Sequence, residues 1–314
     1  MTCGACNVEC QRFGKHRNGL RRFRCSRCHK TYTEAHKPAL EGSYIPQDKV
    51  VLVLRLLVEG NSIRSTQRIS GLDQNTIMKL LVLAGEKCEK LMGRVLVNVP
   101  VRDVECDEIW GYVGKKEGHK TTEEANDATI GDAYTFVAIE RHSKVILNFA
   151  LGRRDQATTD VFVEGLRGAT APQSFQITTD GFGPYRSAIT TTLHDRCDFA
   201  QLIKVYRASV AGEARYSPAE VASTEVVPVM GRPDPERICT SIVERQNLTM
   251  RMQIRRLTRL TNAFSKKWEN LWAALCLHFA YYNLCRIHKS LRVTPAMEAG
   301  ITDRVWEIAE LLSV

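Results

Sequence analysis

Two Cys-x2-Cys pairs at the start of the chain constrain its fold more than any other feature. Cys3 and Cys6 form the first pair, and Cys25 and Cys28 form the second. Each pair presents two sulfurs to one side of a tetrahedral ion, so together they complete a four-thiolate site of the structural zinc type. The spacing predicts a zinc ribbon over residues 1–36. Four other potential ligands are interpreted as polar surface residues or a small core thiol: Cys10, His16, His29 and His36.

The chain is basic, with 44 lysines and arginines against 35 acidic residues and a net charge of +9. Its 44% hydrophobic and 25% charged content is ordinary for a globular protein with a sizeable core. The excess charge favours polyanionic partners, nucleic acid before an anionic membrane. Between the cysteine pairs, Arg21, Arg22 and Arg24 are expected to contact DNA phosphates, although a solvated basic loop would have the same composition.

The first residues show no apolar segment of the kind found in a secretory leader. The most apolar run, residues 50–58, is too short to span a bilayer and contains Arg55. Eleven cysteines in such a chain favour a reducing compartment, where closely spaced cysteines bind metal more often than they form disulfides. We expect a cytoplasmic, nucleoid-associated protein without a membrane partner.

Residues 45–97 have the apolar spacing of helices and are predicted to form a DNA-binding helix-turn-helix. A first helix begins near Gln47, Ser62 is a candidate N-cap for a short second helix, and Asp73 for a third. Gly71 would supply the turn between the last two helices. The third helix would enter a major groove, and an ordinary three-helix bundle is the alternative. The residues expected to contact bases there are Gln74, Asn75, Thr76 and Lys79.

Residues 100–260 alternate strand-like and helix-like stretches. Strands are expected at 103–113, 135–140, 144–151, 175–180 and 199–206, and helices at 157–166 and 185–193. Three strands, helix, strand, helix, strand, helix is the order of an RNase H-like α/β catalytic domain. The stretch 207–235, rich in Ala, Ser, Pro and Gly, is interpreted as an insertion or loop. Residues 261–314 are predicted to be a C-terminal helical segment that closes the core.

Three carboxylates of this domain are candidates for a metal site. Asp180 ends its strand at the carboxyl edge, where α/β sheets place ligands, while Asp107 lies in the first strand and Glu244 in a later helix. Glu105 and Glu108 compete with Asp107. Because adjacent side chains on a strand point to opposite faces, Asp107 and Glu108 should not both serve. The other acidic residues are interpreted as surface carboxylates: Asp103, Asp132, Glu140, Asp160 and Asp198.

Such a carboxylate set suits phosphodiester chemistry. Cleavage needs an activated water or hydroxyl and a stabilised leaving oxygen, and two Mg²⁺ (or Mn²⁺) ions about 4 Å apart can serve both. On the helix that carries Glu244, the helical repeat puts Asn247, Arg251 and Arg255 close to the same stripe. That face predicts metal binding at one end and DNA phosphate contact along the rest, with an exposed helix of polar pairs as the alternative.

The order of several segments resembles bacterial DDE transposases, specifically the insertion-sequence-one family in its single-reading-frame form. The resemblance spans nearly the whole chain. It rests on the two cysteine pairs and on residues 106–110 (CDEIW), 178–182 (TTDGF), 241–251 (SIVERQNLTMR), 281–288 (YYNLCRIH) and 291–297 (LRVTPAM). It implies that Asp107, Asp180 and Glu244 bind the two ions, and that Arg251 is the basic residue common in such enzymes after the glutamate.

The resemblance also implies a reaction and its partners. A water would cut at the transposon ends, and the freed 3′-hydroxyl would attack target DNA without a covalent protein intermediate. The partners would be double-stranded DNA, as ends and as target, and one or more further copies of the chain. Two alternatives remain: a domesticated sequence-specific DNA-binding regulator, and an RNase H-like nuclease without strand transfer.

Overall fold

The computed structural model describes residues 1–16, 20–34, 45–206 and 221–313. The N-terminal part is a three-stranded antiparallel sheet in the order β1-β2-β3. Its strands are β1 (Cys10–Lys15), β2 (Arg21–Cys25) and β3 (Thr31–Thr33). Cys10 pairs with Cys25 across β1 and β2. His36, one of the additional candidate ligands, lies outside the described residues.

Three helices follow: α1 (Gln47–Val58), α2 (Ile63–Ser70) and α3 (Gln74–Val95). Both expected caps are confirmed, because the Ser62 side chain accepts from the Ser65 amide and Asp73 accepts from the Asn75 amide at 2.8 Å. Gly71 ends α2 in the left-handed conformation, with φ 71°, which residues with a side chain rarely adopt. A short helix, α2, joined through this turn to the longer α3 has the element order of a helix-turn-helix.

The main domain is built on a six-stranded mixed sheet in the order β6-β5-β4-β7-β8-β9. Its strands are β4 (Asp103–Val113), β5 (Gly131–Glu140), β6 (Ile146–Gly152), β7 (Phe175–Thr179), β8 (Cys197–Tyr206) and β9 (Val221–Met230). β7 runs parallel to both β4 and β8, whereas the other neighbours are antiparallel. The five expected strands are confirmed in order, and β4 lies in the interior of the sheet.

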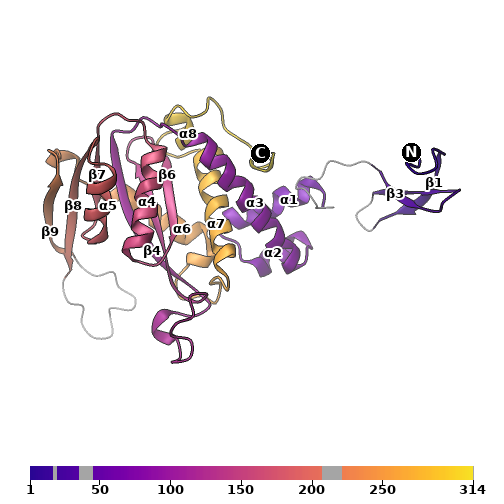
Figure 1. The fold of residues 1–314 in the computed structure, drawn as a ribbon, viewed down its shortest axis with the longest axis horizontal. Helices are drawn as coiled ribbons and strands as arrows, with labels where there is room; N and C mark the ends of the chain where they lie inside the picture. Colours follow the sequence, from indigo (N-terminus) through magenta and orange to yellow (C-terminus); the bar gives the residue numbers. More distant parts are fainter. Residues whose placement is uncertain (17–19, 35–44, 207–220, 314) are drawn as a thin grey trace.

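Helices cover both faces of this sheet (Figure 1). The helices are α4 (Gln156–Ala169), α5 (Pro184–Thr192), α6 (Ser241–Gln253), α7 (Trp268–Ala280) and the short α8 (Pro295–Glu298). On one face, Phe162 of α4 and Tyr185 of α5 pack around Phe136 of β5. On the other face, Phe279 of α7 packs on Phe149 of β6, with ring centroids 4.6 Å apart. The expected core role of the closing helix is therefore confirmed.

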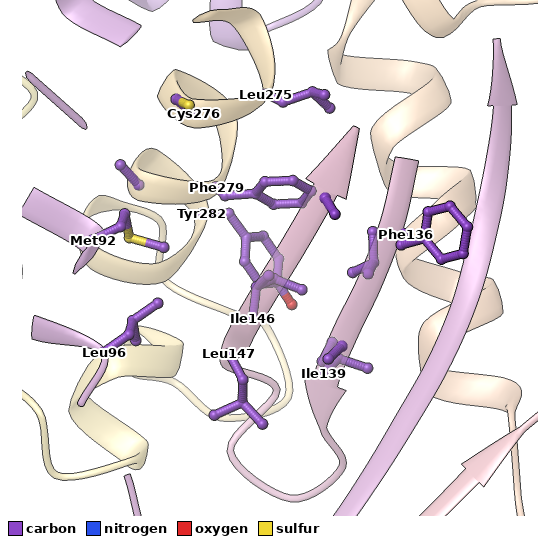
Figure 2. Packing of buried hydrophobic residues seen from close by; sticks show 14 of the residues in the cluster. Met92, Leu96, Phe136, Ile139, Ile146, Leu147, Leu275, Cys276, Phe279 and Tyr282 are labelled. Carbon is purple, nitrogen blue, oxygen red and sulfur yellow. The ribbon is translucent and has the colours of Figure 1, made fainter. Parts of the chain in front are cut away.

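Helix α7 lies between the sheet and α3. Figure 2 shows Met92 of α3 and Leu96, directly after α3, on one side of α7 and Ile146 of β6 on the other. The two helices approach closely where Gly85 of α3 meets Ala273, since a Cβ at Gly85 would stand 2.5 Å from the Ala273 Cα. Helix α3 thus packs into the core of the main domain.

Part of the stretch 207–235 is a strand, so its interpretation as a loop is wrong there. β9 pairs antiparallel with β8 at the edge of the sheet, and Pro228 stands opposite Ala200. An edge strand tolerates a proline because one side of its backbone needs no partner. Most of β9 is exposed, so it lacks the apolar alternation that marks a half-buried strand. Residues 207–220 lie outside the described residues.

The remaining short elements complete the domain. They are η1 (Glu117–His119), η3 (Pro235–Arg237), η4 (Arg255–Leu257), the π-helical η5 (Tyr281–Cys285) and η6 (Glu310–Leu312). In η5, the buried Asn283 donates to the Ile146 carbonyl at 2.8 Å and accepts from the Ile146 amide at 2.9 Å. This side chain therefore satisfies the backbone amide and carbonyl of Ile146 at the start of β6. No helix of the described residues is long and apolar enough to cross a membrane.

His278 of α7 should make stability depend on pH. Its side chain is 1% exposed, and neither ring nitrogen has a hydrogen-bond partner among the described residues. Burial lowers the pKa of His278 from 6.5 to about 3. The unfolded chain therefore binds a proton that the folded one does not between these values, and stability falls as the pH drops through that window, by up to about 1.4 kcal/mol per pH unit.

Unfolding free energies of the wild type and His278→Phe, measured from pH 7 to pH 4, would check this expectation. The variant should lose less stability on acidification than the wild type, because phenylalanine does not titrate. His119→Gln, a change at an exposed histidine in η1, is the matched control and should follow the wild type. Parallel pH profiles for the wild type and His278→Phe would contradict the assignment.

Candidate functional site

Four cysteine sulfurs meet at one end of the N-terminal sheet. Cys3, Cys6, Cys25 and Cys28 each bring a sulfur within 4.8 Å of the other three, a geometry that could hold a metal ion. Cys3 and Cys25 are fully buried, and Cys3 Sγ also lies 3.0 Å from the Tyr32 hydroxyl. A second layer of hydrogen bonds of this kind orients metal ligands. The additional candidates Cys10, His16 and His29 do not belong to the four-sulfur group.

The same sheet carries a basic face. Arg22 and Arg24 of β2 stack over the Phe13 ring at 5.3 and 5.2 Å, and Phe13 is 42% exposed. Arg21 points elsewhere and pairs with Glu34 at 2.7 Å. Of the three arginines predicted to contact DNA, two therefore share an exposed aromatic platform, whereas the third already has an anionic partner within the sheet.

The predicted base-reading residues lie at the start of α3. Gln74, Asn75 and Lys79 are exposed and Thr76 is half-buried. Gln74 Nε2 donates to Gln67 Oε1 of α2 at 2.7 Å, which ties the two helices of the motif together. The exposed first turn of α3 is free to approach a groove, as a recognition helix must.

Three carboxylates converge at the carboxyl edge of the main sheet: Asp107 and Glu108 of β4, and Asp180 directly after β7. We call Asp107, Glu108 and Asp180 the carboxylate cluster. One oxygen of each lies within 4.8 Å of the others, close enough to share a metal ion. Asp180 Oδ1 accepts from the Phe182 amide at 2.9 Å, which fixes the carboxylate at the turn into α5.

The presence of Glu108 in the cluster contradicts the expectation that Asp107 and Glu108 exclude one another. The register does put them on opposite faces, Asp107 opposite Val137 and Glu108 opposite Phe136. However, the ladder between β4 and β7 ends at the pair Cys106–Thr179. Both side chains can therefore reach past the end of β7 towards Asp180. Asp107 also bends forward, since its Oδ1 accepts from the Glu108 amide at 2.8 Å.

Burial and mutual repulsion make this cluster unfavourable as a set of free anions. Burial, with the charges of Glu108 and Asp180, raises the pKa of Asp107 to about 7. Burial and the charge of Asp180 raise the pKa of Glu108 to about 7 as well, against the opposing effects of Tyr185 and Arg154. A cation would relieve both penalties, because it neutralises charges that water cannot reach.

Glu244 lies beside the cluster but is not part of it. It sits in the first turn of α6, and its charge contributes to the raised pKa of Asp107. Its carboxylate instead accepts from Lys204 Nζ of β8 and from the Thr240 hydroxyl, the latter at 2.7 Å. One turn later, Asn247 Nδ2 donates to Asp107 Oδ2 at 2.8 Å. α6 therefore brings Glu244 near Asp107, outside the carboxylate cluster, and holds Asp107 in place through Asn247.

Glu105, the other rival of Asp107, has a different role. Its buried carboxylate accepts from the Ile242 and Val243 amides at 2.8 and 3.0 Å, which caps the N-terminus of α6. Charge at that helix end is favourable because the first amides lack partners. Glu105 thus fixes the helix that carries Glu244. It shares its face of β4 with Asp107 but lies within the ladder with β7, opposite Thr178, instead of past its end.

Two residues interpreted as surface carboxylates are buried instead. Asp103 is 3% exposed and is held by Arg237 and His142, and Glu140 is 4% exposed and accepts from the backbone of the β5–β6 turn. The partners of Asp103 are distant in the sequence, at 142 and 237, whereas those of Glu140 lie in the turn that directly follows it. Both stabilise the end of the sheet opposite the carboxylate cluster.

The prediction that Arg255 continues the stripe of Glu244, Asn247 and Arg251 on one helix is wrong. α6 ends at Gln253, and Ile254 is extended, so Arg255 lies in η4 and off the helix. Arg251 does lie on α6, but its guanidinium donates to the Leu257 carbonyl at 3.1 Å and to the Trp110 carbonyl at 3.5 Å. These contacts fold the segment after α6 back onto β4.

The solved structures that match this chain include two, both at low sequence identity. One, a cryo-EM structure of the piggyBac transposase synaptic complex with hairpin DNA, matches at 9% identity, over 88% of this chain and 72% of that chain, with a TM-score of 0.43. The other, a crystal structure of the Mos1 strand transfer complex, matches at 11% identity, over 78% of this chain and 76% of that chain, with a TM-score of 0.21. At these scores neither likeness bears on the activity of this chain. No protein-family model and no curated protein matches it.

Arg154 is the main site residue that the sequence did not indicate. Its Nε lies 3.1 Å from Glu108 Oε2 and its terminal nitrogen 3.4 Å from Asp180 Oδ2. The guanidinium also stacks on the Phe182 ring, 4.1 Å from the centroid. In the sequence, Arg153-Arg154 showed only positive charge. The residues that Arg154 contacts lie far from it along the chain.

Proposed function

We propose that this chain is a DDE-type DNA transposase with an RNase H-like catalytic domain, in which Asp107, Asp180 and Glu244 hold two Mg²⁺ or Mn²⁺ ions. The observation that carries the proposal is the convergence of three partly buried carboxylates at one sheet edge, beside a helix that supplies another. Bringing several carboxylates together costs electrostatic free energy when their charges are not balanced by cations. A bound metal ion would offset this cost and so explains the arrangement.

The residues present fit such ions. The donors at the cluster are carboxylate oxygens, which Mg²⁺ prefers, with no sulfur or imidazole in the group. When bound, two ions would activate the attacking water or 3′-hydroxyl and stabilise the leaving oxygen. The protein would contribute position: Asn247 holds Asp107, the Phe182 amide holds Asp180, and Glu105 holds the start of α6. To bind an ion, Glu244 would have to break its ion pair with Lys204.

DNA would be bound by the N-terminal modules. The exposed first turn of α3 would read bases with Gln74, Asn75, Thr76 and Lys79, and the platform of Phe13, Arg22 and Arg24 would contact the backbone. Arg21, Arg251 and Arg255 remain predicted phosphate contacts, while Asn247 is better explained as the residue that positions Asp107. Because two DNA ends must be brought together, we also propose that the chain acts as a homodimer or a larger homo-oligomer.

A test needs a DNA end, which the inverted repeats flanking the coding sequence would supply. A duplex ending in that repeat should be joined to a plasmid when Mg²⁺ is present. A regulator without catalysis would bind the duplex and join nothing, and a nuclease would cut without joining.

The four-cysteine group should bind about one zinc ion per chain, held by Cys3, Cys6, Cys25 and Cys28. The closed tetrahedral set leaves no position for substrate, so this ion would be structural. Cys25→Ser should lose the zinc and the folding of the N-terminal sheet, since the ion supplies much of the folding free energy of so small a module. Metal analysis of protein purified without chelators would check this, with Cys239→Ser, outside the group, as control. Zinc-free wild-type protein would contradict the site.

A further inference from the structure

We propose that Glu108 is a fourth carboxylate ligand of the metal site, and that the Arg154 guanidinium takes the place of the metal ion when none is bound. This inference rests on the proposed metal-dependent function. It adds a ligand from the face of β4 opposite to Asp107, so that the site would receive carboxylates from both faces of one strand.

The burial of Glu108 is the first support. Its side chain is 2% exposed, and Oε1 has no hydrogen-bond partner of normal geometry among the described residues. The buried Tyr185 hydroxyl interacts with Glu108 and lowers its pKa, but not in the geometry of a normal hydrogen bond. A buried carboxylate oxygen with only a poorly aligned donor costs free energy that the fold must recover elsewhere. A ligand that binds at Oε1 would recover it.

The direction of Glu108 is the second support. One of its oxygens lies within 4.8 Å of oxygens of both Asp107 and Asp180, the spacing of groups around a shared ion. Among the described residues, Arg154 contacts Glu108 and Asp180 but not Asp107, so one guanidinium does not balance the three carboxylates. The remaining negative charge favours a divalent ion between them.

The position and exposure of the Arg154 side chain are the third support. It precedes α4 at the end of β6, and its side chain is 39% exposed, so it can withdraw into solvent without unfolding a helix. The Phe182 ring supports the guanidinium in its present position. Because Arg154 and a divalent ion carry the same sign, they compete for Glu108 and Asp180. Released from the carboxylates, Arg154 would lie at the site with its charge available for a DNA phosphate.

Calorimetric titration of the full-length zinc-loaded protein with Mn²⁺ would test the proposal without any DNA. Glu108→Gln keeps the shape of the side chain and should weaken Mn²⁺ binding by about 10-fold or more, since loss even of an outer-layer partner costs that much. Glu164→Gln, on the exposed side of α4, is the matched control and should bind as the wild type does. Thermal unfolding of each variant shows that it is folded, and Glu108→Asp, with a shorter carboxylate, should bind with intermediate affinity.

Arg154→Gln should have the opposite effect, tightening Mn²⁺ binding by up to about 10-fold because a competing charge is gone. A merely structural ion pair would predict something else: Glu108→Gln and Arg154→Gln would lower thermal stability alike and leave Mn²⁺ affinity unchanged. That result, with Asp107→Asn still abolishing binding, would overturn the role of Glu108 and leave the proposed function standing. If the zinc-loaded wild-type protein binds no Mn²⁺, both the role of Glu108 and the proposed function fail.

Discussion

Asp180→Asn is expected to abolish metal-dependent joining of a DNA end to target DNA while leaving DNA binding intact. Asp107→Asn and Glu244→Gln should do the same. Each change keeps the size of the side chain but removes a charge that would bind an ion in the transition state. The joining rate should fall by about 1000-fold or more, which corresponds to about 4 kcal/mol in activation free energy. The decrease should persist at saturating DNA, because the binding modules are elsewhere in the chain.

The measurement is the initial rate of plasmid joining, run beside a binding titration with the same duplex. Asp303→Asn, at an exposed position in the C-terminal segment, is the matched control and should join DNA at the wild-type rate. Full joining by all three site variants would contradict the assignment of the site. Loss of binding in step with joining would indicate instead that these residues support the fold.

Gly85→Ala should strongly destabilise the protein. Gly85 lies where α3 crosses α7, and an added Cβ would stand 2.5 Å from the Ala273 Cα and 2.6 Å from its Cβ. Real atoms do not approach so closely, so the helices must separate, at a cost of about 3 kcal/mol for overpacking against backbone. The same separation would loosen the packing of α3 against α7, which lies on the sheet.

Gly93→Ala supplies the control on the same helix. Gly93 is exposed, and a Cβ there would meet nothing within 4 Å. Alanine should therefore stabilise the protein, by about 0.5 to 1 kcal/mol, because it favours the helix and restricts the unfolded chain. Chemical denaturation of both variants would measure this difference in sign. Equal effects of the two substitutions would show that the helices do not cross as closely as described.

Local signals in the sequence were sufficient for the caps and the strand order. Ser62, Gly71 and Asp73 act on amides or turns within a few residues, so their roles follow from residue type alone. The cysteine pairs are likewise local, and the structure brings their sulfurs together. Residues typical of strands were enough to predict the inner strands β4, β5 and β7, which are largely buried. β9 was missed because an exposed edge strand needs no such pattern.

Long-range partners explain the errors at the site. The rule that excluded Glu108 assumes that a strand has neighbours along its whole length, whereas the ladder between β4 and β7 stops just before Asp107. Arg255 was placed by extending a helix past Ile254, whose extended backbone ends it. Glu105 and Asp103 find their partners more than a hundred residues away, at 242–243 and 237. No periodicity in the sequence reports such contacts.

The structure assigns the carboxylates of β4 to distinct roles. Asp103 and Glu105 hold the segments that lead into α6, and Asp107 and Glu108 face Asp180 from the two sides of the strand. Residue type did not distinguish them, since all four are acidic and all lie within six positions of one another. Position relative to the end of β7 does distinguish them, because only the last two extend beyond it.

The chemistry of the joined product tests the central claim most directly. A duplex carrying the flanking inverted repeat, labelled on its 3′-hydroxyl strand, would be incubated with the wild-type protein, Mg²⁺ and a plasmid, then denatured and treated with protease. We predict a product in which the labelled strand is joined to plasmid DNA, which forms only with a divalent metal and carries no attached protein at any time. A joined product that forms in chelator, or a labelled strand trapped on the protein before joining, would contradict the proposed function.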